Sequence, residues 1–159
     1  MSKTEAVQDF IDMIANVGSV PIKVKYYGTT PELSQEGWGS WIDCYTAEEV
    51  CLQAGTRTYI PLGFAMQLPP GYEAILAPRS STFKRWGILQ TNSIGVIDST
   101  YNGDDDQWMM PVLATRDITI PKGTRLCQFR IQEEQPKIKF IPVSSLGNEA
   151  RGGLGSTGE

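Results

Sequence analysis

The chain has 159 residues, of which 40% are hydrophobic and 20% charged, and its formal net charge is −4. This length and composition predict one globular domain with a core of its own. The acidic balance argues against duplex nucleic acid as a partner, because phosphate backbones are bound by basic surfaces. The sequence has no histidine. This excludes Ser-His and Cys-His catalytic pairs, and it leaves a carboxylate or a metal ion to activate water in any hydrolase.

Two features bear on the cellular compartment. The three cysteines, Cys44, Cys51 and Cys127, lack the spacing of a metal site, so we expect reduced thiols. The chain carries no apolar run of the length of a membrane span. We therefore expect a cytoplasmic protein, in the host cytoplasm if the gene is viral, with no membrane contact.

Residues 4–17, "TEAVQDFIDMIANV", place their apolar side chains at helical spacing, and Gly18 follows as a stop signal. This pattern predicts an amphipathic helix that docks on the domain. A role of this helix in contacting a partner protein stays open.

After Gly18 the sequence changes to short β-rich runs separated by Pro, Gly and Asp turns. The runs cover residues 20–27, 41–46, 57–68, 72–78, 109–115, 124–132 and 137–143. One helical turn is expected at "RSSTFKRWG", residues 79–87. Many short strands with few helices predict an all-β sandwich, jelly roll or barrel. We divide the chain into an N-terminal helical extension (1–18), a β domain (19–146) and a C-terminal tail (147–159).

The stretch "GVIDSTYNGDDD", residues 95–106, contains the most informative carboxylate. Asp98 follows three apolar residues directly, a costly place for a charge unless it is paired, metal-bound or used in chemistry. The three acidic residues 104–106 point alternately on an extended chain. A solvated loop tip is therefore expected there, rather than a metal site.

Four further stretches carry groups suited to a phosphorylated ligand. "SWIDCYT" (40–46) contains Asp43 and "PRSS" (78–81) contains Arg79, while "KGTRLCQF" (122–129) and the Gly-rich tail "RGGLGSTGE" (151–159) carry Arg, Gln, Ser and Thr. Each is weak alone. Arg79 could form a surface ion pair, Gln128 could sit at a strand edge, Asp43 could be bonded in a turn, and the tail could be a disordered end.

Taken together and in this order, the stretches resemble the trimeric dUTPase family. Its five motifs match "SWIDCYTA", "PRSS", "TNSIGVIDSTYNGD", "KGTRLCQF" and "RGGLGSTG". The resemblance implies jelly-roll-like protomers with a flexible Gly-rich tail, assembled as a homotrimer with shared active sites. It also implies Mg²⁺-dependent hydrolysis of dUTP to dUMP and pyrophosphate.

The resemblance also implies roles for the nucleoside-binding residues. Asp98 matches the general base, and a partly buried setting would favour its accepting a proton near neutral pH. Tyr101 matches the aromatic that packs on the deoxyribose and excludes a 2′-hydroxyl. Asn92, with the backbone of Val96 and Ile97, matches the groups that read the uracil edge.

The same resemblance assigns the phosphate-binding residues. They are Arg79, Ser80 and Ser81 of the second motif, Gln128 of the fourth, and Arg151, Ser156 and Thr157 of the tail. Mg²⁺ is expected to be held mainly by the substrate phosphates, with Asp43 contacting it through water.

Three positions depart from the family pattern. "Ser40-Trp41-Ile42-Asp43-Cys44" replaces Ala-Gly-x-Asp-Leu, Thr124 replaces an Asp, and Leu154 replaces the Phe that stacks over uracil. "QWMM", residues 107–110, could supply the cap through Trp108 or Met109, or could be a plain core strand.

Two alternatives remain at this point. A dCTP deaminase shares the expected fold and the "RSS" element, although Tyr101 and the Gly-Ser-Thr tail favour a dUTPase. A regulatory protein that binds a partner such as a repressor could use the helix at residues 4–17.

Overall fold

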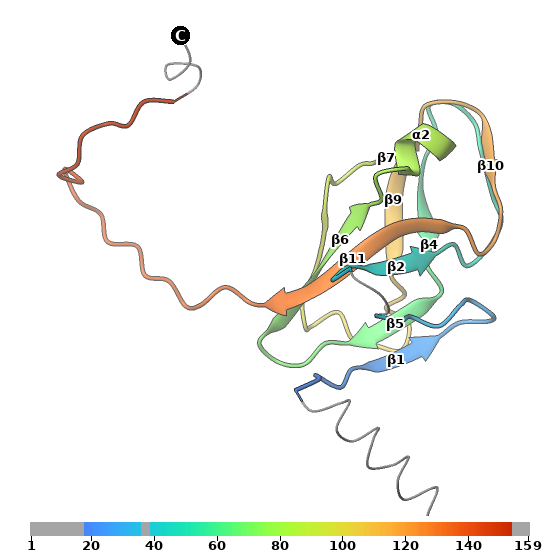
Figure 1. Ribbon diagram of the computed structural model, residues 1–159, viewed down its shortest axis with the longest axis horizontal. Coiled ribbons are helices and arrows are strands. Elements are labelled where there is room, and N and C mark those ends of the chain that lie inside the picture. The colour runs from blue at the N-terminus through green and yellow to red at the C-terminus, as the bar shows by residue number, and fades with distance from the viewer. Residues whose placement is uncertain (1–17, 36–38, 154–159) are drawn as a thin grey trace, which may run out of the picture.

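The computed structural model describes residues 18–35 and 39–153, and strands dominate this part of the chain (Figure 1). The strands are β1 Lys23–Tyr26, β2 Ile42–Tyr45, β3 Val50–Leu52, β4 Arg57–Pro61, β5 Phe64–Gln67, β6 Tyr72–Pro78, β7 Ile88–Gln90, β8 Gly95–Ile97, β9 Met109–Ala114, β10 Ile118–Ile120 and β11 Arg125–Glu133. The helix α2, Thr82–Trp86, lies within the expected helical turn. The all-β, jelly-roll-like expectation is thus confirmed. The helix expected at residues 4–17 and tail residues 154–159 lie outside the described part.

All the strand pairs are antiparallel. One sheet has the order β2-β11-β6-β8 and a second has the order β4-β9-β7, while β1 pairs with β5 and β3 with β10. The segment between β7 and β8 therefore passes from one sheet to the other. That crossing places residues 91–94 at the boundary between the two sheets.

The core lies between these sheets and is apolar. An aromatic cluster forms its centre, where the Trp108 ring lies 5.1 Å from both Phe64 and Phe129 between ring centroids. All three side chains are almost fully buried. Aromatic pairs of this kind stabilise the fold beyond the free energy that comes from burying their apolar area. Within residues 18–35 and 39–153, no helix is long and apolar enough to cross a membrane.

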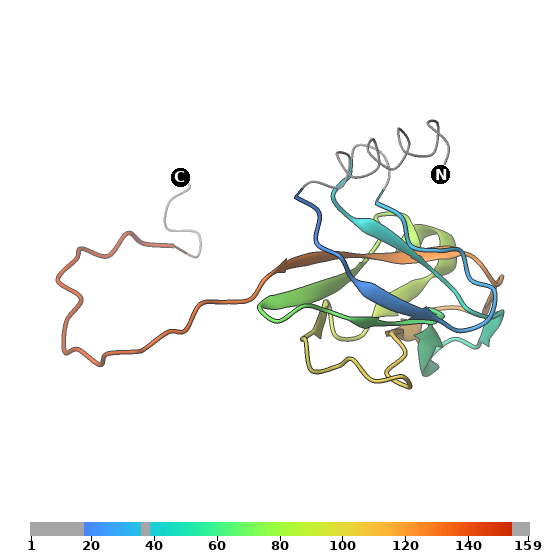
Figure 2. The ribbon, with the colours of Figure 1, turned by 90° about the horizontal axis from the view of Figure 1, so that it is seen from below.

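Beyond β11 the chain leaves the sheets as an extended arm, residues 134–153 (Figures 1 and 2). The strand expected at residues 137–143 is wrong, because the arm has no regular secondary structure. A strand needs a neighbour to accept its backbone hydrogen bonds, and the described chain offers none there. The apolar residues of the arm consequently stay exposed, with Phe140 87% and Ile141 72% accessible.

Candidate active site

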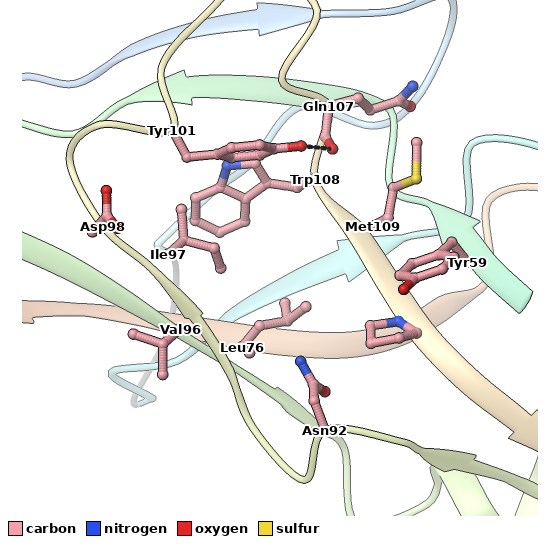
Figure 3. Close-up of a pocket in the computed structure, with 12 residues that line it drawn as sticks. Tyr59, Leu76, Asn92, Val96, Ile97, Asp98, Tyr101, Gln107, Trp108 and Met109 are labelled. Carbon is pink, nitrogen blue, oxygen red and sulfur yellow. Dashed lines mark hydrogen bonds between the residues drawn. The ribbon is translucent and has the colours of Figure 1, made fainter.

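A cavity of about 520 Å³ lies at the boundary between the two sheets (Figure 3). Strands β4 and β9 line one side of it, β6 and β8 line the other, and the loop 98–107 closes one end. It collects Asn92, Val96, Ile97, Asp98, Tyr101 and Met109, all expected from the sequence as nucleoside-binding or catalytic residues.

Strand β8 forms an exposed backbone edge in this cavity. Among the described strands it is the outermost of its sheet and pairs with β6 alone, with Leu76 opposite Gly95. Val96 is 60% exposed although it is apolar. An edge strand presents unpaired N–H and C=O groups, which is the kind of surface that can read the polar edge of a planar base.

Asn92 stands on the turn that carries the chain from β7 into β8. Ser93 has a positive φ of 58°, uncommon for a residue with a side chain, and the Ile94 N–H donates to the Asn92 carbonyl at 2.6 Å. Gln90 donates through Nε2 to Asn92 Oδ1 at 2.9 Å and to the Leu76 carbonyl at 3.2 Å. The Asn92 side chain is therefore held by a neighbour while it lines the cavity.

Asp98 follows β8 directly and is exposed. The Thr100 hydroxyl and the Thr100 backbone N–H both donate to its Oδ1, the latter at 2.7 Å. These hydrogen bonds favour the charged form and lower the pKa of Asp98 below its usual range. The expected partly buried setting is thus wrong for the single chain, because the side chain emerges where β8 ends and faces solvent.

Tyr101 closes the cavity from the loop 98–107. Its hydroxyl donates to the Gln107 carbonyl at 3.1 Å (Figure 3). Partial burial, followed by the negative charge of Asp106, raises the pKa of Tyr101. The phenol therefore stays protonated at neutral pH. Lys25 of β1 stabilises this loop, because its Nζ donates a hydrogen bond to the Asp104 carbonyl at 2.9 Å.

The wall opposite Asn92 is apolar and comes from β4 and β9. Met109 is 42% exposed and Tyr59 is 69% exposed, and the two side chains lie close together in Figure 3. Trp108 borders the cavity but is only 1% exposed, within the aromatic cluster. Burial alternates from Trp108 into β9, because successive side chains of an extended chain point to opposite faces. Trp108 is thus a core residue, and of the two expected cap residues Met109 alone presents a free surface.

Two of the phosphate-binding residues expected from the sequence, Arg79 and Ser81, lie together in a second hollow. Arg79, Ser81, Arg85 and Arg125 line it. The Arg79 backbone N–H donates to Thr82 Oγ1 at 2.9 Å, which fixes the turn between β6 and α2. Ser80 is exposed in this turn, and Ser81 begins α2 without a capping hydrogen bond from its hydroxyl.

Asp43 lies at the centre of the positive charge around this hollow. Its Oδ1 lies 2.9 Å from Arg79 Nε, and its Oδ2 lies 3.4 Å from Arg125 Nη1. The Asp43 side chain is 29% exposed. Gln128, on the neighbouring strand β11, donates to the Pro78 carbonyl at 3.2 Å. The Asp43 carboxylate thus pairs with two guanidinium groups at once.

The two hollows are far apart in one chain. Ile97 pairs with Ala74, so Asp98 lies at the level of Glu73, near the start of β6. Arg79 follows the opposite end of the same strand, six positions further on. At about 3.3 Å per residue, this places them roughly 20 Å apart. Arg151 is exposed on the arm, and Leu154, Ser156 and Thr157 lie outside the described residues.

Sequence reasoning missed several residues of these hollows. Tyr59 lines the nucleoside cavity, and Gln90 and Thr100 donate hydrogen bonds to the lining residues Asn92 and Asp98. Arg125 and Arg79 both pair with Asp43. Thr100 could have been found, because a hydroxyl two residues after an Asp is typical of an Asx turn. The others depend on contacts between distant strands, which no local pattern reports.

Comparison of the sequence with known proteins finds one family. The dUTPase family model matches residues 39–158. The SPbeta prophage-derived deoxyuridine 5′-triphosphate nucleotidohydrolase YosS of Bacillus subtilis is 50% identical over 138 residues, which cover 86% of this chain and 97% of that protein. Deoxyuridine 5′-triphosphate nucleotidohydrolase of Rickettsia akari is 35% identical over 149 residues, covering 90% of this chain and 99% of that protein.

Solved structures resemble the fold. The Staphylococcus bacteriophage 80alpha dUTPase with dUpNHpp has a TM-score of 0.70 and 20% identity, covering 87% of this chain and 99% of that one. The Streptococcus mutans dUTPase has a TM-score of 0.65 and 19% identity, covering 73% of this chain and 98% of that one. At these identities the likeness concerns the fold, while the family model and the sequence relatives concern the family. On this evidence the chain belongs to the dUTPase family.

Proposed function

We propose that this chain hydrolyses dUTP to dUMP and pyrophosphate. The observation that carries the proposal is the cavity beside β8. It brings a carboxylate, an aromatic ring, a carboxamide and a free strand edge to one place. The names of the relatives, nucleotidohydrolases of deoxyuridine 5′-triphosphate, support the same substrate.

In this proposal the cavity binds the deoxyuridine part. The Asn92 side chain and the backbone edge of Val96 and Ile97 pair with the uracil edge, and a base with the wrong donors leaves these groups unpaired. Tyr101 packs on the deoxyribose and leaves no room for a 2′-hydroxyl. Met109 covers the base from the β9 side, with Tyr59 beside it.

Asp98 acts as the general base. Both hydrogen bonds from Thr100 end on Oδ1, so Oδ2 is the oxygen that takes a proton from the attacking water. The lowered pKa keeps the carboxylate ionised at neutral pH and therefore competent to accept that proton. Water is added across the bond between the α- and β-phosphates, and pyrophosphate is the leaving group.

Arg79 and Ser81 bind the phosphates from the second hollow, together with Ser80 and Gln128. Arg151, Ser156 and Thr157 close over the phosphates from the tail. Among the described residues, no cluster of three or more His, Cys, Asp or Glu side chains could cage a metal ion. The lack of such a cluster in the described residues fits a Mg²⁺ that is already bound to the triphosphate when the substrate enters. Asp43 would contact this ion through water. When bound, the ion neutralises phosphate charge; a phage phi11 dUTPase structure from Staphylococcus aureus contains a structural Mg(II) ion.

We further propose that the active protein is a homotrimer whose sites are shared between chains. The separation of roughly 20 Å between Asp98 and Arg79 is too long for both to act on one bond within one chain. The extended arm, with its exposed apolar residues, is suited to pack on a neighbouring chain. Light scattering coupled to size exclusion measures this assembly directly, and a monomer at micromolar concentration would contradict it.

Pyrophosphate release with Mg²⁺ across dUTP, dCTP, dTTP and UTP tests the activity. We expect release from dUTP at a kcat/KM far above that for the other three, and an Asp98→Asn control with little turnover. Ammonia release from dCTP would favour the deaminase alternative instead. The regulatory alternative depends on the helix at residues 4–17, outside the described residues, and no contact in the described part favours it.

A further inference from the structure

Gln90 does not line the nucleoside cavity but donates hydrogen bonds to two residues that do, Leu76 and Asn92. It lies at the end of β7, is half-buried, and none of the sequence motifs includes it. Its Nε2 lies 3.2 Å from the Leu76 carbonyl and 2.9 Å from Asn92 Oδ1. Its own Oε1 is buried and accepts no hydrogen bond from the described residues. The Nε2 group of Gln90 thus donates to two acceptors, while Oε1 of the same amide has no donor among the described residues.

The Leu76 carbonyl decides how this amide is oriented. It belongs to the central strand β6 and can only accept a hydrogen bond. Turning the Gln90 amide over would place Oε1 against that carbonyl and would bury the two N–H donors without acceptors. Nε2 therefore faces Leu76, and the same Nε2 faces Asn92.

This orientation is passed on to Asn92. If the Asn92 amide alone turned over, its Nδ2 would meet the Nε2 of Gln90, and two donors would face each other. Oδ1 of Asn92 must consequently point at Gln90, and Nδ2 must point the other way. Figure 3 shows the nitrogen of Asn92 directed into the cavity, toward Leu76.

The space in front of this nitrogen is kept open by Gly95. A Cβ at position 95 would lie 3.1 Å from Leu76 Cβ and 3.7 Å from Asn92 Nδ2. Because Gly95 has no side chain, the amino group of Asn92 can reach a ligand in the cavity.

We infer that Gln90 is a positioning residue that fixes Asn92 as a hydrogen-bond donor to a carbonyl oxygen of the base. This inference rests on the proposed binding of deoxyuridine in the cavity. Without Gln90 the Asn92 amide could turn and present Oδ1, and a base carbonyl would then meet an acceptor. The structure thus assigns to Gln90 a share in substrate recognition although it does not touch the substrate.

The test is Gln90→Glu, which keeps the shape and removes the donors. The introduced carboxylate is repelled by the Leu76 carbonyl. It attracts the amino group of Asn92, and this attraction turns the Asn92 amide over. We expect KM for dUTP and Kd for dUMP to rise about tenfold or more. We expect kcat to change less than threefold, since Asp98 is untouched. Gln53→Glu, at the exposed position directly after β3, makes the same chemical change as a matched control.

A double-variant cycle separates positioning from a general effect on folding. In an Asn92→Ala background no amide remains to be oriented, so adding Gln90→Glu should change Kd for dUMP less than twofold. An equal loss in both backgrounds would overturn the inference. Gln90→Met, uncharged and of similar length, provides the measurement if Gln90→Glu does not fold. It should raise Kd for dUMP about threefold or more, and an unchanged Kd would overturn the inference.

The two proposals fail in different ways. A wild-type protein that releases no pyrophosphate from dUTP would defeat the proposed function. A wild-type protein that hydrolyses dUTP, together with a Gln90→Glu variant of unchanged KM and Kd, would defeat only the role of Gln90.

Discussion

Tyr101 offers a sharp test of sugar selection, because its ring and its hydroxyl can be removed separately. Tyr101→Phe removes one neutral hydrogen bond, the 3.1 Å contact with the Gln107 carbonyl. At a side chain that is 42% exposed, this loss should cost about 0.5–1 kcal/mol of stability. The ring remains in place, so we expect the preference for dUTP over UTP to be kept.

Tyr101→Ala removes the ring itself. Because the ring is only half-buried, the free energy of unfolding should fall by about 1–2 kcal/mol. The wall that excludes a 2′-hydroxyl disappears with it. Discrimination by one small group in a pocket typically amounts to about 1–3 kcal/mol, so the ratio of kcat/KM for dUTP to that for UTP should fall about 10- to 200-fold.

Steady-state pyrophosphate release measures both ratios, and thermal unfolding measures both stabilities. The reasoning is refuted if a folded Tyr101→Ala variant keeps the wild-type ratio, because Tyr101 would then only pack the loop. It is also refuted if Tyr101→Phe relaxes the ratio as far as Tyr101→Ala does, because the hydroxyl and not the ring would then select the sugar.

Three further predictions concern the neighbouring residues. Asp98→Asn should keep dUMP binding and lower kcat by about 10²- to 10⁴-fold; near-wild-type turnover would remove Asp98 from the role of base. Thr100→Val removes the largest cause of the lowered Asp98 pKa. Because kcat/KM needs the ionised carboxylate and is lost as pH falls through its pKa, it should begin to fall at a higher pH in the variant than in the wild type; an unshifted acid limb would contradict this. Ser93→Gly relieves the positive φ of 58° and should raise or preserve the thermal midpoint while weakening dUMP binding through a looser Asn92; a lower midpoint would show that the turn is not strained.

Much of the fold was predictable because its signals are local. Alternating apolar residues and Pro or Gly turns mark β4, β6, β9 and β11, and the short run before Asp98 marks β8. The arm was not predictable in this way. Residues 137–143 have the composition of a strand, but a strand forms only where a partner edge lies within reach.

The same distinction between local signals and distant contacts holds for the site. The third motif placed Asn92, Asp98 and Tyr101 together, and Met109 was one of two possible caps; the structure brings all four to one cavity. The setting of Asp98 could not be read from its apolar neighbours, because it depends on where β8 ends. The pairing of Asp43 with Arg79 and Arg125 joins residues far apart in the chain, and so does the contact of Gln90 with Leu76.

The central claim is that Asp98 of one chain and the tail of another complete each dUTP site. The most direct test mixes full-length Asp98→Asn chains with chains that end at Glu149 and retain Asp98, after joint refolding. Each variant alone should release almost no pyrophosphate from dUTP. The account predicts that the mixture regains a clear fraction of wild-type activity, because mixed trimers contain sites with both an intact Asp98 and an intact tail. A control mixture in which the truncated chain also carries Asp98→Asn should stay inactive. Mixed trimers, confirmed by differential tags, that are no more active than the separate variants would contradict the account.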